Sequence, residues 1–135
     1  MKNTFIFLFI AISSFNAQIL DNEFGKAFTD IPFFNETFIL QNKVKSLKGE
    51  YTFKKAGDIM RKTAYRCNYY FDEHGHLIET FETRALNSKT DTIQNQYEYN
   101  AKNQLVLVRK KDHGGYQSTY YELDSLNRIL SIETK

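Results

Sequence analysis

Apolar and polar residues alternate with a period of two over much of the chain. Aromatic or aliphatic residues stand at every second position, and mostly polar side chains lie between them. The alternating apolar positions are Tyr51 and Phe53, then Cys67, Tyr69 and Phe71, then Tyr97 and Tyr99, and finally Tyr121 and Leu123. A period of two with one apolar face is typical of half-buried antiparallel strands. The pattern therefore predicts an all-β protein.

Each alternating run leads into a similar short unit, and the units begin at Phe53, Phe71, Tyr99 and Leu123. The seventh position of every unit is aliphatic. The fifth position holds a residue type that tolerates a positive φ angle. The second position mostly holds a short polar side chain that can accept hydrogen bonds from backbone N–H groups. We therefore predict hairpins built on a type I turn followed by a left-handed residue. The predicted turn residues are Gly57, Gly75, Asn103 and Asn127 at the fifth position, with Asp72, Asn100 and Asp124 at the second.

The connections between these units differ from one another. His113-Gly114-Gly115 predicts a tight turn between two strands, whereas the polar residues 84–91 predict a longer loop. The whole pattern predicts an antiparallel meander of about four repeated β-hairpins in one curved sheet, with eight or nine strands in all. The repeats span residues 49–135, and the 135-residue chain is long enough for one domain.

The first residues have the features of a secretory signal peptide. Lys2 is followed by an apolar run over residues 5–12, and Ala17 is a small residue at a suitable cleavage point. The apolar run is shorter than the roughly 20 residues of a membrane-spanning helix. We expect residues 1–17 to be removed near Ala17 and the protein to be exported to the periplasm or the exterior, without a membrane span. Cys67 is the only cysteine, so an internal disulfide is impossible, and it is expected on the apolar face.

Residues 18–48 carry a weaker pattern, interpreted as a lead-in with one or two strands that belongs to the same domain as the repeats. Residues 33–40 are apolar and β-prone, which predicts a strand. A single curved sheet of this size cannot easily cover its own aromatic face. We therefore expect residues 24–40 to pack across the repeat sheet or to extend it.

The charge balance gives no indication of a nucleic-acid partner. Charged residues make up 25% of the chain, and the net charge is only +2. Domains that bind nucleic acids usually carry a clustered basic patch. The run Arg109-Lys110-Lys111 is short and is followed by Asp112, which indicates a solvated strand end.

The repeat unit resembles a known family motif. Aromatic-x-aromatic-Asp-x-x-Gly-x-Leu is the motif of YD-repeat (Rhs) proteins, and residues 69–77 resemble it most closely. Residues 97–105 are similar, with Asn103 in place of glycine, whereas Lys54 and Leu123 depart from the motif in the other two units. The resemblance extends from about residue 50 to the end and implies a stack of β-hairpins in a short secreted bacterial protein. It implies no catalytic residue.

His74-Gly75-His76 is the segment that most suggests a ligand site. The two imidazoles flank a turn glycine beside Asp72 and Glu73. Zinc sites in proteins usually have three or four ligands. Because the repeat pattern places both histidines at exposed turn positions, we expect a solvated turn, with no metal site and no cofactor.

The acidic residues give a weak indication of catalysis. Glu79 and Glu82 are three positions apart in one strand and therefore point to opposite faces. Glu98 and Glu122 lie on the polar face of different repeats and could approach each other. No catalytic residue is predicted. The preferred interpretation is a non-enzymatic exported binding or structural module, and the alternative is a small carbohydrate-active or hydrolytic enzyme that uses these acidic residues. We expect any protein or cell-surface partner to add a strand along the C-terminal edge, residues 128–134.

Overall fold

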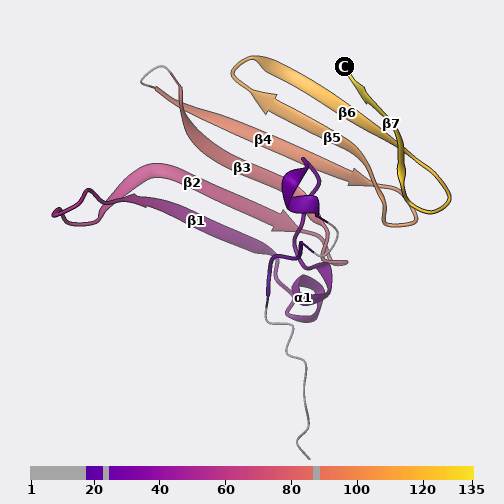
Figure 1. Cartoon of the computed structure of the whole chain (residues 1–135), viewed down its shortest axis with the longest axis horizontal. Helices are drawn as coiled ribbons and strands as arrows, with labels where there is room; N and C mark the ends of the chain where they lie inside the picture. Colours follow the sequence, from indigo (N-terminus) through magenta and orange to yellow (C-terminus); the bar gives the residue numbers. More distant parts are fainter. Residues whose placement is uncertain (1–17, 23–24, 87–88) are drawn as a thin grey trace, which may run out of the picture.

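The computed structural model describes residues 18–22, 25–86 and 89–135, and these form one open sheet of seven antiparallel strands (Figure 1). The strand order follows the chain, so the predicted meander is confirmed. The described strands number fewer than the eight or nine expected. They are β1 (Ser46–Phe53), β2 (Arg61–Phe71), β3 (Leu77–Leu86), β4 (Lys89–Tyr99), β5 (Leu105–Asp112), β6 (Gly115–Leu123) and β7 (Ile129–Thr134).

The four repeat units form the turns β1–β2, β2–β3, β4–β5 and β6–β7. Their fifth residues all have positive φ angles: 76° at Gly57, 88° at Gly75, 60° at Asn103 and 63° at Asn127. In the last three turns, the strand pairing also shifts register at the residue before the turn. A register shift beside a left-handed residue is the geometry of a hairpin with a bulge.

The prediction of a long loop over residues 84–91 is wrong. Strands β3 and β4 stay paired as far as Leu86 and Lys89, so only residues 87–88 lie between them. Arg84 and Asp91 face each other across this pair, with Arg84 Nε 3.2 Å from Asp91 Oδ2. These residues are polar because they lie at a strand end outside the hydrophobic core. At such a position a cross-strand ion pair stabilises the sheet as an apolar pair does elsewhere.

The prediction of a strand over residues 33–40 is also wrong, because most of this segment belongs to the helix α1 (Glu36–Gln41). The side chain of Asn35 caps the helix by accepting a hydrogen bond from the backbone N–H of Phe38, at 2.9 Å. Asparagine is among the strongest N-cap residues. Before the helix lie a 3-10 turn, η1 (Lys26–Phe28), and an isolated antiparallel bridge between Leu20 and Phe34.

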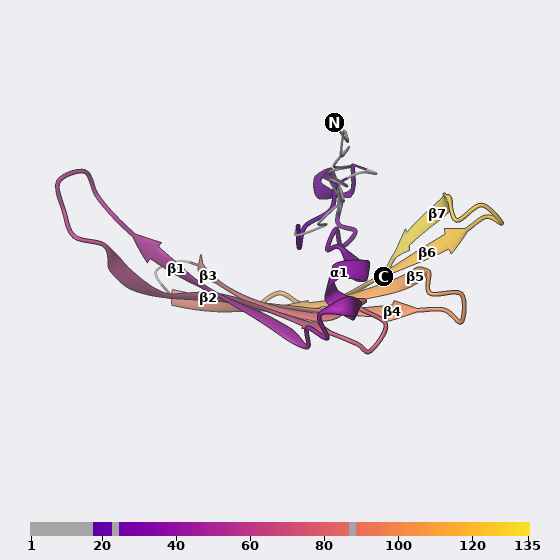
Figure 2. The ribbon, with the colours of Figure 1, turned by 90° about the horizontal axis from the view of Figure 1, so that it is seen from below.

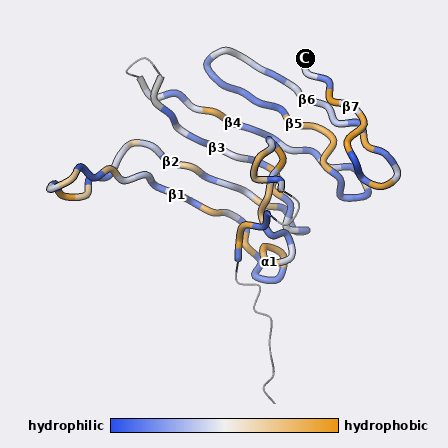
Figure 3. Tube along the Cα trace, in the orientation of Figure 1, coloured by the Kyte–Doolittle hydropathy of each residue, from blue (hydrophilic) through white to orange (hydrophobic). Residues whose placement is uncertain are grey.

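The described N-terminal segment lies on the concave side of the curved sheet (Figure 2). Ile39 of α1 packs there against Phe71 and Leu77, and these three side chains form the buried core cluster. Half-buried residues surround the cluster: Ile19, Phe34, Val44, Leu47, Tyr69 and Tyr97. The segment therefore packs across the sheet rather than extending it. Figure 3 shows the resulting distribution, with hydrophobic residues both around α1 and on the distant strand β7.

Candidate functional site

Strand β7 is an open edge of the sheet, because among the described residues it pairs with β6 alone. All of its residues, 129–134, are exposed, although three of them are large aliphatic side chains. Leu130 is 63% exposed and Ile132 is 58% exposed. An exposed edge strand with apolar side chains is a template for pairing with another strand.

The register of β7 determines which of its backbone groups are free. Ser118 and Lys135 exchange both backbone hydrogen bonds, at 2.8 and 2.9 Å. Hydrogen-bonded and non-hydrogen-bonded pairs alternate along an antiparallel ladder. The pairs Tyr120↔Glu133 and Glu122↔Ser131 are therefore bonded, and the N–H and C=O groups of Ile132 and Thr134 point away from β6.

The opposite edge, β1, has features that disfavour pairing. Its register shifts between Glu50 and Thr52, which indicates a bulge. Lys48 and Glu50 place charges in the middle of the strand. Bulges and central charges are common devices that keep an edge strand from pairing. In β7 the charged residues lie at the end, where Lys135 Nζ is 3.2 Å from Glu133 Oε1.

The acidic residue at the start of the β2–β3 turn holds the turn together. Asp72 Oδ1 accepts hydrogen bonds from the backbone N–H groups of His74 and His76, both at 2.9 Å. Its other oxygen, Oδ2, lies 3.2 Å from His76 Nδ1. The same arrangement recurs in the β4–β5 turn, where Asn100 bonds to the backbone of Lys102 and Gln104, and in the β6–β7 turn, where Asp124 bonds to that of Leu126 and Arg128.

In these turns the sixth residue of the unit also bonds back to the second through its side chain. Asn100 Nδ2 donates to Gln104 Oε1 at 2.8 Å, and Arg128 Nε donates to Asp124 Oδ2 at 2.7 Å. His76 occupies this position in the β2–β3 turn. In these three turns the sixth position of the unit therefore helps to complete the turn, although it is not one of the positions that define the repeat pattern.

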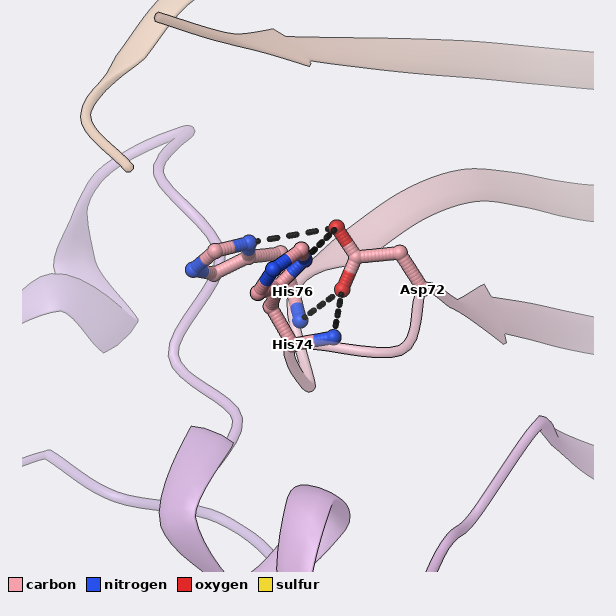
Figure 4. Close-up of side chains that lie close together, drawn as sticks. All are labelled: Asp72, His74 and His76. Carbon is pink, nitrogen blue, oxygen red and sulfur yellow. Dashed lines mark hydrogen bonds and ion pairs between the residues drawn. The ribbon is translucent and has the colours of Figure 1, made fainter. Parts of the chain in front are cut away.

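The structure places His76 differently from the solvated position expected for it. Its side chain is buried, with 4% of the residue exposed, and its ring stacks on Tyr99 with the centroids 4.6 Å apart. His76 Nε2 lies 3.7 Å from Glu36 Oε2 at the start of α1. His74 is exposed as expected, and Figure 4 shows both imidazoles directed towards the Asp72 carboxylate. Burial follows from the packing of α1 against this turn, which the repeat pattern does not encode.

Burial raises the pKa of Asp72, but the hydrogen bonds from His76 and His74 outweigh this effect and leave the pKa below its usual value. A carboxyl group with a lowered pKa in the folded state stabilises the protein above its unfolded pKa, and this stability is lost as the pH falls through the folded pKa.

Asp72→Asn should therefore reduce stability most at neutral pH, because asparagine keeps the turn geometry seen at Asn100 but lacks the charge. The difference in the free energy of unfolding between the wild type and Asp72→Asn should shrink as the pH falls below about 4. Denaturant titrations at several pH values measure this difference. A difference that stays constant down to pH values well below about 4 would contradict the assigned role of the carboxylate.

The acidic residues of the strands do not form the cluster considered from the sequence. Glu98 and Glu122 lie on β4 and β6 with β5 between them, and each has its own partner: Arg109 for Glu98 and Ser131 for Glu122. Glu79 and Glu82 point to opposite faces, as expected. Glu79 lines a depression with Phe81 on one face. Glu82 accepts a hydrogen bond from the Tyr51 hydroxyl at 3.2 Å on the other.

The concave face has a shallow pocket of about 330 Å³ beside the N-terminal segment. Glu82, Asn95, Lys110 and Asp30 give it a polar lining, together with Tyr97 and Tyr121. Burial is the main cause that raises the pKa of both tyrosines. Cys67 lies half-buried on the same face, next to Tyr69. Burial, with Cys67 and Glu82 nearby, raises the pKa of Tyr69 to about 12.

Comparisons with protein-family models, with curated proteins and with solved structures found no match for this chain. Within residues 18–22, 25–86 and 89–135, no helix is long and apolar enough to cross a membrane. The predicted signal peptide, residues 1–17, lies outside the described residues.

The sequence did not predict two residues that contact the β2–β3 turn. Glu36 approaches His76 from α1, and Tyr99 packs under its ring from β4. The signal for Glu36 was Asn35, a strong N-cap residue followed by an acidic residue in the first helical turn. Tyr99 was predicted on the apolar face, but its partner could not be derived without the packing of the turns.

Proposed function

We propose that this protein is a non-enzymatic exported binding module, built of YD-like β-hairpins, that binds an extended polypeptide segment along β7. The observation that carries the proposal is that every residue of β7 is exposed and that the backbone groups of Ile132 and Thr134 point away from β6. Main-chain hydrogen bonds to a sheet edge supply affinity in strand addition, and alternate side chains supply specificity. A partner bound in this way becomes an eighth strand of the sheet.

The side chains beside the edge define the chemistry of the partner. Ile132 lies on the same face as Tyr121, its cross-strand neighbour. The Glu133 and Lys135 charges balance each other, so the edge offers little net charge. A segment with apolar residues at every second position would place them beside Ile132 and gain burial on that face. We therefore expect an uncharged, alternating partner sequence.

Amide hydrogen exchange of the isolated protein tests the edge directly. The amides of Ile132 and Thr134 should exchange fast, whereas those of Ser131 and Glu133 should be protected because they bond to β6. Slow exchange at all four amides in the monomer would contradict an open edge.

Selection of displayed extended peptides against the protein then tests binding. A selected peptide should protect the amides of Ile132 and Thr134, and Ile132→Pro should abolish binding because proline has no N–H. Ser131→Ala, which changes a neighbouring side chain and keeps every backbone donor, is the control and should bind the peptide normally. Concentration-dependent protection of the same amides without peptide would identify a second copy as the occupant, and peptides that protect other residues would contradict the proposal.

Export is tested separately, on protein made in a bacterial host with its first residues intact. N-terminal sequencing of the exported fraction should give a chain that starts near Gln18, because the apolar run and Ala17 fit signal-peptide cleavage. Soluble cytoplasmic protein that retains Met1 would contradict export.

A further inference from the structure

We propose that Asp72, His74 and His76 bind one divalent transition-metal ion at the β2–β3 turn, with zinc as the representative ion. One ligand atom from each of the three residues lies within 4.8 Å of the other two. Asp72 Oδ2 is 3.2 Å from His76 Nδ1 and 3.9 Å from His74 Nδ1 (Figure 4). Ligand atoms around a tetrahedral zinc ion, at bond lengths of about 2.0–2.1 Å, stand roughly 3.3 Å apart. The Asp72–His76 distance is already close to that spacing, and the exposed His74 side chain is the one that has to move closer for the ion to bind.

The two oxygens of Asp72 have separate roles in this arrangement. Oδ1 is held by the backbone N–H groups of His74 and His76, which fixes the orientation of the carboxylate. From the described residues, Oδ2 accepts no backbone hydrogen bond, and it points between the two imidazoles. A ligand whose orientation is fixed by neighbouring hydrogen bonds loses less freedom when it binds a metal.

The His76 ring is stacked on one face and has a carboxylate near each of its two nitrogens. Its ring stacks on Tyr99, and its Nε2 faces the Glu36 carboxylate at 3.7 Å while its Nδ1 faces Asp72. Histidine ligands of metals usually donate their second ring N–H to a carboxylate, a backbone carbonyl or water, which sets the tautomer and the ring orientation. His74 is exposed and leaves a path for the ion from solvent.

The ligand types indicate the class of ion. Two imidazole nitrogens and one carboxylate oxygen suit zinc, copper or nickel, whereas magnesium and calcium prefer oxygen ligands. Three protein ligands leave a coordination position for water or for a group from another molecule.

The other turns of the same chain provide an internal comparison. Asn100 and Asp124 hold their turns through the same pair of backbone hydrogen bonds as Asp72. Their units carry Lys102 with Gln104, and Leu126 with Arg128, where the β2–β3 turn has its two histidines. The turn geometry therefore needs no histidine, and the two imidazoles are the additional feature of this turn. No metal site was expected from the sequence, because the ligand set was incomplete and the repeat pattern placed both histidines in solvent. The buried and oriented His76 instead supplies a fixed ligand beside Asp72.

The test is calorimetric titration of the mature chain, prepared without a polyhistidine tag, with zinc chloride. One ion should bind per chain, and zinc should raise the unfolding temperature. His74→Gln removes an exposed ligand and should weaken binding at least about tenfold. The double variant Asp72→Asn/His76→Gln reproduces the Asn100/Gln104 pair of the β4–β5 turn and should also lose binding while it still unfolds cooperatively. His113→Gln, which changes the remaining histidine at a distant turn, is the control and should bind zinc normally.

Equal zinc affinity in the wild type and His74→Gln would overturn the proposal. A loss of binding confined to His113→Gln would also overturn it, because it would assign the ion to the β5–β6 turn. Should the double variant fail to fold, His74→Gln decides alone, because its exposed side chain contributes little to packing. The imidazole proton resonances provide a second readout, since zinc should shift those of His74 and His76 and leave those of His113 in place.

Discussion

Replacing Gly75 with valine should destabilise the domain by about 2–5 kcal/mol, as the sum of backbone strain and steric overlap. Gly75 has a φ angle of 88°, which a β-branched residue adopts only with strain. A Cβ atom at this position would also collide with the backbone carbonyl oxygen of Glu36 and would stand 3.2 Å from the backbone nitrogen of Leu40. Both contacts are with the backbone of α1, which can move away only if the helix leaves its place on the sheet.

Gly57→Val is the matched control, because Gly57 holds the same position of the repeat in the β1–β2 turn. Its φ angle is 76°, but nothing lies within 4 Å of an added Cβ atom. This variant should therefore cost only the backbone strain, about 1–3 kcal/mol. Urea or guanidinium titrations of the two variants measure the difference. Equal destabilisation would show that α1 does not pack against the β2–β3 turn as closely as the structure indicates.

The two glycines show which structural features the repeat pattern can predict. The pattern predicts a positive φ angle at both positions, and by itself it predicts similar effects of on the order of 1–2 kcal/mol for either substitution. It contains nothing about the neighbours of a turn. The close approach of Glu36 to Gly75 depends on where α1 lies, and α1 belongs to a segment outside the repeats.

The strands were predictable because an antiparallel sheet with one covered face imposes a period of two on its sequence. The helix α1 was not, because its residues 36–41 complete fewer than two helical turns, and Phe38, Ile39 and Leu40 are also common in strands. The residues near Arg84 and Asp91 were misassigned for a related reason. They lie at the ends of β3 and β4 that are outside the core, so these parts of the two strands carry no apolar alternation.

Parts of the two candidate sites could also be predicted from the sequence, and other parts could not. The C-terminal edge could be predicted, because the last strand of a meander has a neighbour on one side only. The direction of its free N–H groups could not, because a shift of the register by one residue would exchange Ile132 with Ser131. The metal-binding geometry depends on the burial of His76 between Tyr99 and Glu36, and neither residue adjoins it in the sequence.

Ile39→Ala should destabilise the whole domain by about 2–5 kcal/mol, because it leaves a cavity beneath α1. Ile39 is 1% exposed and packs on Phe71 and Leu77, which bracket the β2–β3 turn. The variant tests whether residues 18–42 are part of the cooperative fold or only rest on a sheet that is stable without them.

Leu40→Ala is the control on the same helix, since Leu40 is 49% exposed, and it should cost less than about 1 kcal/mol. Denaturant titrations followed by far-UV circular dichroism and by tyrosine fluorescence measure both variants. If α1 is integral, the two probes should report one transition that shifts to lower denaturant in Ile39→Ala. If the sheet of Ile39→Ala instead unfolds at the denaturant midpoint of the wild type, after α1 has detached, the β-hairpins are stable by themselves. The cluster around Ile39 would then not hold the domain together. The first result is expected, because the N-terminal segment lies on the concave side of the sheet, and among the described residues the buried cluster beneath it contains only Ile39, Phe71 and Leu77.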